Sequence, residues 1–270
     1  FPRHRALERS PCAVFPRQLA ARGRLTGKDT WNEPFAEERN AMTLELAPTP
    51  TAVLIEGGVG CGKTTALVAR VAALLEDGAT PENMLMLAAT PDAARVLAAR
   101  LIEAVGERGG TVEVTCARDV ALGLLASEED RTFSGRAGRL VTPVELGFIM
   151  EDMKTSGLKQ RRLREMLKFF YRSWTELADD DPDWLLPGEE TDVHTLLKEN
   201  LAFMRAVVEP EAANLAARYL REHDEARAAH SYAHVLMDDY ACASRASQTL
   251  ANLVATCSIT VSPISVRICY

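Results

Sequence analysis

The chain has 270 residues, of which 47% are hydrophobic and 26% charged, and its formal net charge is −7. These proportions are ordinary for a folded protein, and they exclude a mainly disordered chain, a collagen-like chain and a coiled-coil rod. The mildly acidic total argues against nonspecific nucleic-acid binding by bulk charge, although it leaves room for a local basic groove.

Residues 1–41 carry eight Lys or Arg and five Asp or Glu, contain four prolines and show no sustained apolar period. This composition predicts a poorly ordered N-terminal extension. The first methionine is Met42. We weigh two explanations equally: Met42 is the native start and the earlier residues are upstream sequence translated in frame, or these residues form a flexible arm.

Between residues 42 and 125 short apolar runs alternate with segments of helical spacing. The expected strands are residues 51–56, 84–88 and 112–115. The expected helices are residues 63–76, a segment that begins at Pro91 and passes through Ile102, and a short helix ending at Leu125. Strands that alternate with helices predict a parallel α/β sheet.

Residues 126–227 have helical character throughout. One amphipathic stretch runs from Thr142 towards Leu177; another covers 192–208, is ended by Pro210, and is followed by a helix over 211–225. Strand character returns at residues 234–237. We therefore expect residues 42–125 and 228–270 to form the α/β domain, with 126–227 as an inserted all-helical subdomain.

The segment GGVGCGKT at residues 57–64 fits the pattern G-x-x-x-x-G-K-[ST] and lies between an expected strand and an expected helix. Such a loop cradles phosphates with its backbone N–H groups, helped by the positive end of the following helix. Lys63 would reach the outer phosphates, and the Thr64 hydroxyl would ligate Mg²⁺. The residues expected to bind ATP are Gly57, Gly58, Val59, Gly60, Cys61, Gly62, Lys63, Thr64 and Thr65.

A phosphate loop needs an acidic partner at the end of another buried strand. Residues 235–237 are apolar and are followed by Asp238 and Asp239. We expect Asp238 to hold Mg²⁺, directly or through water, and Asp239 to position or deprotonate the attacking water. The predicted catalytic residues are therefore Lys63, Asp238 and Asp239.

With these motifs in place, the chain resembles the N-terminal, first RecA-like domain of UvrD/Rep-type superfamily-one DNA helicases. Residues 87–95 resemble the family's second motif, residues 114–121 the next one, and residues 231–240 its D-E-x-Q-D block. The resemblance implies a P-loop NTPase (RecA-like) parallel sheet, and a helical insertion in the place of the family's 1B subdomain.

The same resemblance implies ATP and Mg²⁺ as cofactors, translocation on single-stranded DNA and a role in DNA repair. It implies single-stranded-DNA contacts at Thr90 and Thr115. It also suggests duplex DNA contacts at a basic surface of the inserted helices, which carries Lys154, Lys159, Arg161, Arg162, Arg164, Lys168 and Arg172.

Several positions depart from the family pattern. Its glutamate is Asp239 here, one methylene shorter; its glutamine and final aspartate are Ala241 and Cys242, and a DNA-stacking aromatic is Ala89. Residues 261–270 do not contain the family's G-D-x-x-Q-S segment, and residues 1–270 do not include the second RecA-like domain that the resemblance implies. We therefore expect nucleotide binding with slow hydrolysis, and no unwinding without that second domain or a partner chain.

Two other functions stay open. One is another P-loop NTPase, such as a nucleotide kinase or an ABC-type ATPase. The other is a degenerate module that binds nucleotide, DNA or a partner without turnover. The six cysteines (12, 61, 116, 242, 257 and 269) have no zinc or disulfide spacing, no apolar run reaches the ~18 residues of a membrane span, and charges run through residues 1–9. We therefore expect a cytoplasmic protein without a membrane partner.

Overall fold

The computed structural model describes residues 50–58, 60–126 and 133–262, so the expected N-terminal extension at 1–41 lies outside the described residues. A five-stranded parallel sheet forms the centre, with the strand order β1-β5-β4-β2-β3. The strands are β1 (Thr51–Leu54), β2 (Met84–Ala88), β3 (Glu113–Cys116), β4 (Tyr232–Asp238) and β5 (Ala255–Ser262). The predicted parallel α/β fold is confirmed.

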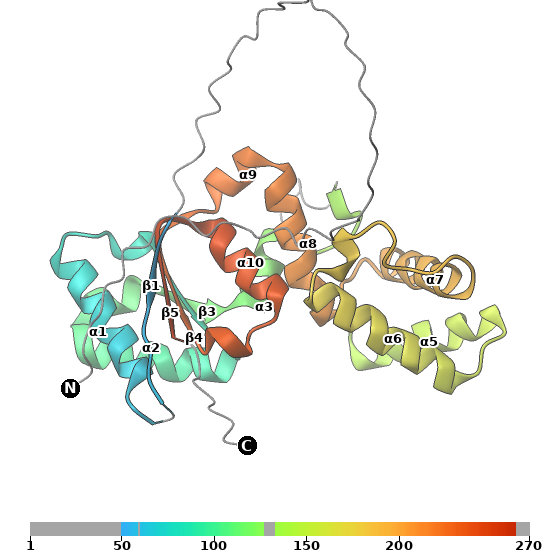
Figure 1. Ribbon diagram of the computed structural model, residues 1–270, viewed down its shortest axis with the longest axis horizontal. Helices are drawn as coiled ribbons and strands as arrows, with labels where there is room; N and C mark the ends of the chain where they lie inside the picture. The colour runs from blue at the N-terminus through green and yellow to red at the C-terminus, as the bar shows by residue number, and fades with distance from the viewer. Residues whose placement is uncertain (1–49, 59, 127–132, 263–270) are drawn as a thin grey trace, which may run out of the picture.

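Helices cover both faces of the sheet, and Figure 1 shows the two layers on either side of the strands. The helices α1 (Lys63–Glu76) and α2 (Pro91–Val105) pack on one face, in a core that includes Leu67, Met86 and Leu236. The other face is covered by α3 (Ala117–Leu124), α8 (Glu209–Glu222), α9 (Asp224–Ala229) and α10 (Arg245–Val254). Because helices cover both faces of β2, every residue of this strand is buried, and its sequence is one apolar run.

The strand β1 is different, because it lies at the edge of the sheet beside β5. Three of its four residues are exposed, and Leu54 keeps 49% of its surface accessible. The strand that leads into the phosphate loop is therefore held by one neighbour among the described residues.

Three further helices form a separate lobe, drawn on the right of Figure 1: α5 (Pro143–Asp152), α6 (Gln160–Thr175) and α7 (Glu189–Phe203). They enclose their own core around Ile149, Phe170 and Trp174. A capping box begins α5, since the Thr142 hydroxyl accepts from the Glu145 N–H and the Glu145 carboxylate accepts from the Thr142 N–H.

A buried ionic cluster lies where this lobe meets the sheet domain. Glu211, in the first turn of α8, is fully buried and accepts two hydrogen bonds from Arg136, at 2.7 and 2.9 Å. Lys198 of α7 adds a third at 2.6 Å. Burial opposes ionisation of Glu211, but the bonds and charges of both cations outweigh it, so its pKa lies below the usual range.

The structure corrects two expectations about the helical region. The stretch from Thr142 towards Leu177 is two helices, α5 and α6, separated by a turn in which Gly157 has a φ of 81°. Pro210 does not end a helix; it lies in the first turn of α8, which begins at Glu209. Proline is tolerated there because the first N–H groups of a helix have no intrahelical partner.

The helical region is also divided between two cores: α8 and α9 contribute to the core on the sheet with α3 and α10, whereas α5, α6 and α7 enclose their own. The two parts touch where α8 contacts α6, since the Asn214 amide donates to the Trp174 carbonyl at 3.1 Å. We therefore propose that the inserted subdomain is smaller than residues 126–227 and ends before α8. Among the helices in the described residues, none combines the length and apolar character needed to cross a bilayer.

Candidate nucleotide-binding site

The phosphate loop joins β1 to α1 at the carboxyl edge of the sheet. The Ile55 N–H donates to the Val261 carbonyl at 2.9 Å, which extends the β1–β5 pairing into the loop. Gly60 and Gly62 then adopt left-handed backbone angles, with φ of 73° and 85°, and α1 begins at Lys63. Glycine adopts such angles without strain, so the loop can turn sharply at these two positions. The predicted residue Val59 lies outside the described part of the chain.

Lys63 lies over this loop, where its ammonium group donates to the carbonyls of Gly57 at 3.1 Å and Gly58 at 2.7 Å. The first turn of α1 contains no acidic residue, and its N-cap residue, Gly62, has no side chain to bond the N–H groups. Free N–H groups at a helix start carry partial positive charge and bind anions. The loop therefore presents a cation and a positive helix end to the same space.

The two predicted acids lie at the end of β4, and Asp238 contacts the loop directly. The Thr64 hydroxyl donates to Asp238 Oδ2 at 2.7 Å, although 174 residues separate the two positions. They meet because β1 and β4 are parallel strands of one sheet, with β5 between them, so their carboxyl ends share an edge. The other oxygen, Oδ1, accepts from the Ser262 hydroxyl at 2.5 Å and from the Asp239 N–H at 3.1 Å.

Asp239 turns the chain away from the sheet, with a left-handed φ of 51°. This region is uncommon for residues other than glycine, although aspartate visits it more readily than most. Burial and the neighbouring charge of Asp238 raise the pKa of Asp239, while Lys63 acts in the opposite direction. A carboxylate with a raised pKa is a better proton acceptor near neutral pH.

A cavity of about 360 Å³ joins these groups. It is lined by Gly60, Gly62, Lys63, Thr64, Thr65, Arg100, Asp238 and Asp239. Sequence analysis missed Arg100, which extends from α2. The residues around Arg100 carry no local signal for this role, because its place in the cavity depends on the packing of α2 beside α1.

The pair Thr64 and Asp238 offers a hydroxyl and a carboxylate oxygen within 2.7 Å of each other. Mg²⁺ prefers oxygen ligands and is held in proteins by one or two carboxylates together with substrate phosphates and water. The donor set therefore fits this ion beside a bound triphosphate. Among the residues with described positions, no group of three or more His, Cys, Asp or Glu side chains converges to form an all-protein metal site.

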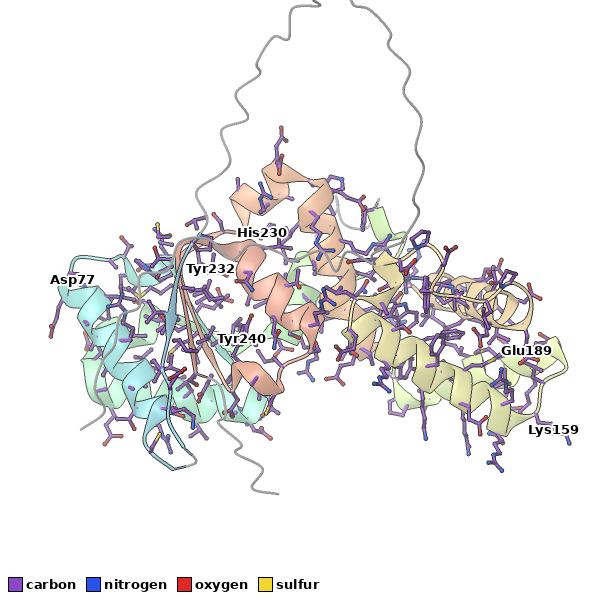
Figure 2. All side chains as sticks on the ribbon, in the orientation of Figure 1. Asp77, Lys159, Glu189, His230, Tyr232 and Tyr240 are labelled. Atoms are coloured by element: carbon purple, nitrogen blue, oxygen red, sulfur yellow. The ribbon has the colours of Figure 1, made fainter. Side chains whose placement is uncertain are left out.

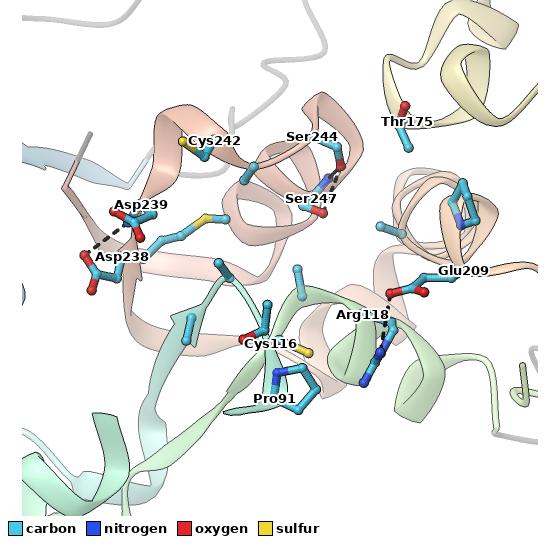
Figure 3. A pocket seen from close by; sticks show the side chains of 18 residues that line it. Pro91, Cys116, Arg118, Thr175, Glu209, Asp238, Asp239, Cys242, Ser244 and Ser247 are labelled. Atoms are coloured by element: carbon cyan, nitrogen blue, oxygen red, sulfur yellow. Dashed lines mark hydrogen bonds and ion pairs between the residues drawn. The ribbon is translucent and has the colours of Figure 1, made fainter. Parts of the chain in front are cut away.

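A second cavity of about 410 Å³ lies beside the first and shares Asp238 and Asp239 with it (Figure 3). It opens at the carboxyl ends of β2, β3 and β4, and Arg118 of α3 pairs with Glu209 at its far wall, at 3.3 Å. The predicted DNA contact Thr90 lines this cavity and caps α2 by accepting from the Ala93 N–H.

The other predicted DNA contact, Thr115, pairs with Leu87 within the sheet. It lies one residue before Cys116, which lines the second cavity, as does Cys242. Thr90 and Thr115 therefore come from neighbouring strand ends, but they stand in different surroundings.

Comparisons with known sequences identify the family of this chain. Residues 36–260, most of the chain, match the sequence model of the UvrD/REP helicase N-terminal domain. The chain is also similar to two proteins described as ATP-dependent DNA helicase PcrA, from two strains of Staphylococcus epidermidis, with 28% identity over 112 residues in each case. That similarity covers 41% of this chain but 15% of either relative. The chain therefore belongs to the UvrD/REP helicase family and matches its N-terminal domain.

Proposed function

We propose that this chain is the ATP-binding part of a UvrD-like DNA helicase that, when complete, hydrolyses ATP to move along single-stranded DNA. The observation that supports this best is the contact between Thr64 and Asp238, which joins the phosphate loop to the acidic strand end. The family to which the chain belongs supports use of ATP and binding of DNA. A role in DNA repair and a cytoplasmic location stay predictions.

In this proposal four side chains of the cavity have distinct tasks. A triphosphate would draw Lys63 away from the carbonyls of Gly57 and Gly58, because phosphate oxygens are stronger acceptors for an ammonium group. Thr64 and Asp238 would hold Mg²⁺, which supplies neutralisation of charge on the outer phosphates when bound. Asp239 would orient the attacking water or accept its proton.

A binding measurement tests the proposal. We expect a fluorescent ATP analogue to bind the chain in Mg²⁺ and to bind the Lys63→Ala variant about 10–100-fold more weakly, the usual loss for a hydrogen bond to a charged group. Lys159→Ala is a matched control, because Lys159 is exposed and labelled in Figure 2 at the end of the lobe furthest from the sheet. Equal binding by all three proteins would contradict the proposal.

For single-stranded DNA we propose the second cavity as the contact region. It combines the backbone turn at Thr90 with Arg118, which can contact phosphate, and it adjoins the nucleotide cavity through Asp238 and Asp239. We expect Arg118→Ala to weaken single-stranded-DNA binding and to reduce its salt dependence by about one phosphate contact. An unchanged salt slope would remove Arg118 from this role.

Duplex DNA would contact the lobe rather than the sheet. Arg164, Lys168 and Arg172 are exposed and lie four residues apart on α6, so they follow one side of this helix. Repeated cations on one helix face suit contact with successive phosphates. We expect the triple alanine variant to lose duplex affinity while nucleotide binding is unchanged.

A second candidate function is a module that binds nucleotide without turnover. It is favoured by Asp239, which is one methylene shorter than the family glutamate; displacements of about 1 Å can cost about a hundredfold in rate. Measurements of ATP hydrolysis with and without single-stranded DNA separate the two. Asp239→Glu should raise hydrolysis if the rest of the site is competent, and no change would favour the module.

A further inference from the structure

We infer that Ser262 is a positioning residue that orients both acids of this site, and the inference rests on the proposed function. Ser262 is the last residue of β5 and is paired in register with Asp238 at the end of β4. Its side chain is fully buried. A buried hydroxyl needs partners, and here both partners belong to the acidic pair.

The first partner is the carboxylate of Asp238. Ser262 donates to Oδ1 at 2.5 Å, whereas Thr64 donates to Oδ2 at 2.7 Å. Two hydroxyls, one from the first turn of α1 and one from the end of β5, therefore hold the two oxygens, and the plane of the carboxylate is fixed between them. If Mg²⁺ takes the place of the Thr64 contact, Ser262 still holds Oδ1.

The second partner is the backbone of Asp239. Its N–H donates to Asp238 Oδ1 at 3.1 Å and to the Ser262 hydroxyl at 3.3 Å. Asp239 has the left-handed φ of 51°, which costs free energy unless its surroundings favour it. The same hydroxyl therefore supports the backbone turn that places the Asp239 side chain in the nucleotide cavity.

Hydrogen-bond partners behind a metal ligand set its orientation, and their removal typically costs about 10–100-fold in metal affinity. Ser262→Ala should therefore weaken the Mg²⁺-dependent part of nucleotide binding by about tenfold, seen as a higher Mg²⁺ concentration at half-saturation. Affinity for the ATP analogue in EDTA should stay unchanged, because Lys63 and the loop are intact.

The control is Ser258→Ala. Ser258 lies on the same strand, is 7% exposed and bonds the His234 ring at 2.8 Å. It pairs with His234, four residues before Asp238 on β4, so it does not contact the two acids. It should lower stability by a comparable amount without moving the Mg²⁺ requirement. Ser262→Cys, which keeps a weak donor, should fall between wild type and Ser262→Ala.

A second readout needs no nucleotide. Amide hydrogen exchange at Asp239 should be faster in Ser262→Ala than in wild type and in Ser258→Ala, since the N–H loses one acceptor. If wild type shows no Mg²⁺-dependent nucleotide binding, the proposed function fails. If wild type shows it, and Ser262→Ala matches Ser258→Ala in both Mg²⁺ requirement and Asp239 exchange, the inference fails while the function stands.

Discussion

The phosphate loop and the base of the helical lobe satisfy their charged side chains in opposite ways. At the loop, Lys63 donates to backbone carbonyls while Asp238 is bonded by hydroxyls and an amide, so cation and anion satisfy different neighbours. At the base of the lobe, Glu211 takes hydrogen bonds directly from Arg136 and Lys198. The first arrangement can be exchanged for a ligand, whereas the second is complete without one. Charged residues bonded by neutral groups are thus available for a ligand, whereas charged residues bonded to each other contribute to stability.

The largest effect that tests this comparison is expected at Glu211. Glu211→Ala would leave Arg136, which is 4% exposed, as an uncompensated buried cation. Removal of one member of a buried ion pair typically costs about 3–5 kcal/mol of unfolding free energy. Urea denaturation measures this loss. Nucleotide affinity of the folded fraction should not change, and a parallel loss of affinity would show that the two regions are not separate.

A pH effect is expected from His194 in the lobe. Its ring packs against Trp174, and burial, together with the charge of Lys198, lowers its pKa to about 4; Glu211 acts in the opposite direction. The unfolded chain therefore binds a proton below pH ~6.5 that the folded chain does not bind until about pH 4. Stability should fall as the pH falls through this window.

For His194 the expected loss is about 2 kcal/mol, less than the full shift implies because the ring is partly exposed. Thermal melts from pH 7 to 4 measure it. His194→Phe removes the titrating group and should flatten the curve over this range. An unchanged slope in that variant would assign the effect to other groups.

A smaller effect is expected in the loop itself. A Cβ added at Gly57 would overlap the Cys61 side chain at its sulfur atom. Gly57→Ala should therefore displace the loop and weaken nucleotide binding by about tenfold, or ~1.4 kcal/mol. Cys61→Ala removes the sulfur, so the double variant should recover most of the affinity. Additive losses in this double-mutant cycle would place the strain elsewhere.

The smallest effect is expected at the start of α5. Thr142→Ala removes the hydroxyl that accepts from the Glu145 N–H. Loss of such a cap typically costs about 1 kcal/mol. Urea denaturation should show this decrease with no change in DNA or nucleotide binding, whereas a loss of more than ~2 kcal/mol would mean that the capping box also fixes the path of the segment before it.

Local pattern was enough to predict much of the sheet domain. The helix Lys63–Glu76 and the strand Met84–Ala88 have the predicted bounds, because apolar spacing and flanking glycine or proline act within the segment itself. The meeting of Thr64 with Asp238 also followed from sequence, since parallel strands bring their carboxyl ends to one edge. The prediction for Pro210 is wrong because this proline occupies the first turn of the following helix, as Pro91 does in α2.

What the sequence did not indicate depends on contacts between distant elements. Ser262 reaches Asp238 because β5 inserts between β1 and β4, an order that chain position does not reveal. Arg100 lines the nucleotide cavity because α2 packs beside α1, a contact between elements that local pattern does not show. The buried Glu211 had the appearance of an ordinary surface acid in a helix, and only packing of the lobe against α8 gives it two cations.

The edge position of β1 bears on how this protein should be handled in solution. Among the described residues β1 is paired on one side, so it opens more easily than its neighbours, and the opening would carry the phosphate loop with it. A ligand that binds the closed loop suppresses such fraying by mass action. Limited proteolysis near residue 55 should therefore be slowed by magnesium nucleotide, and purification with nucleotide in the buffer should keep this edge protected.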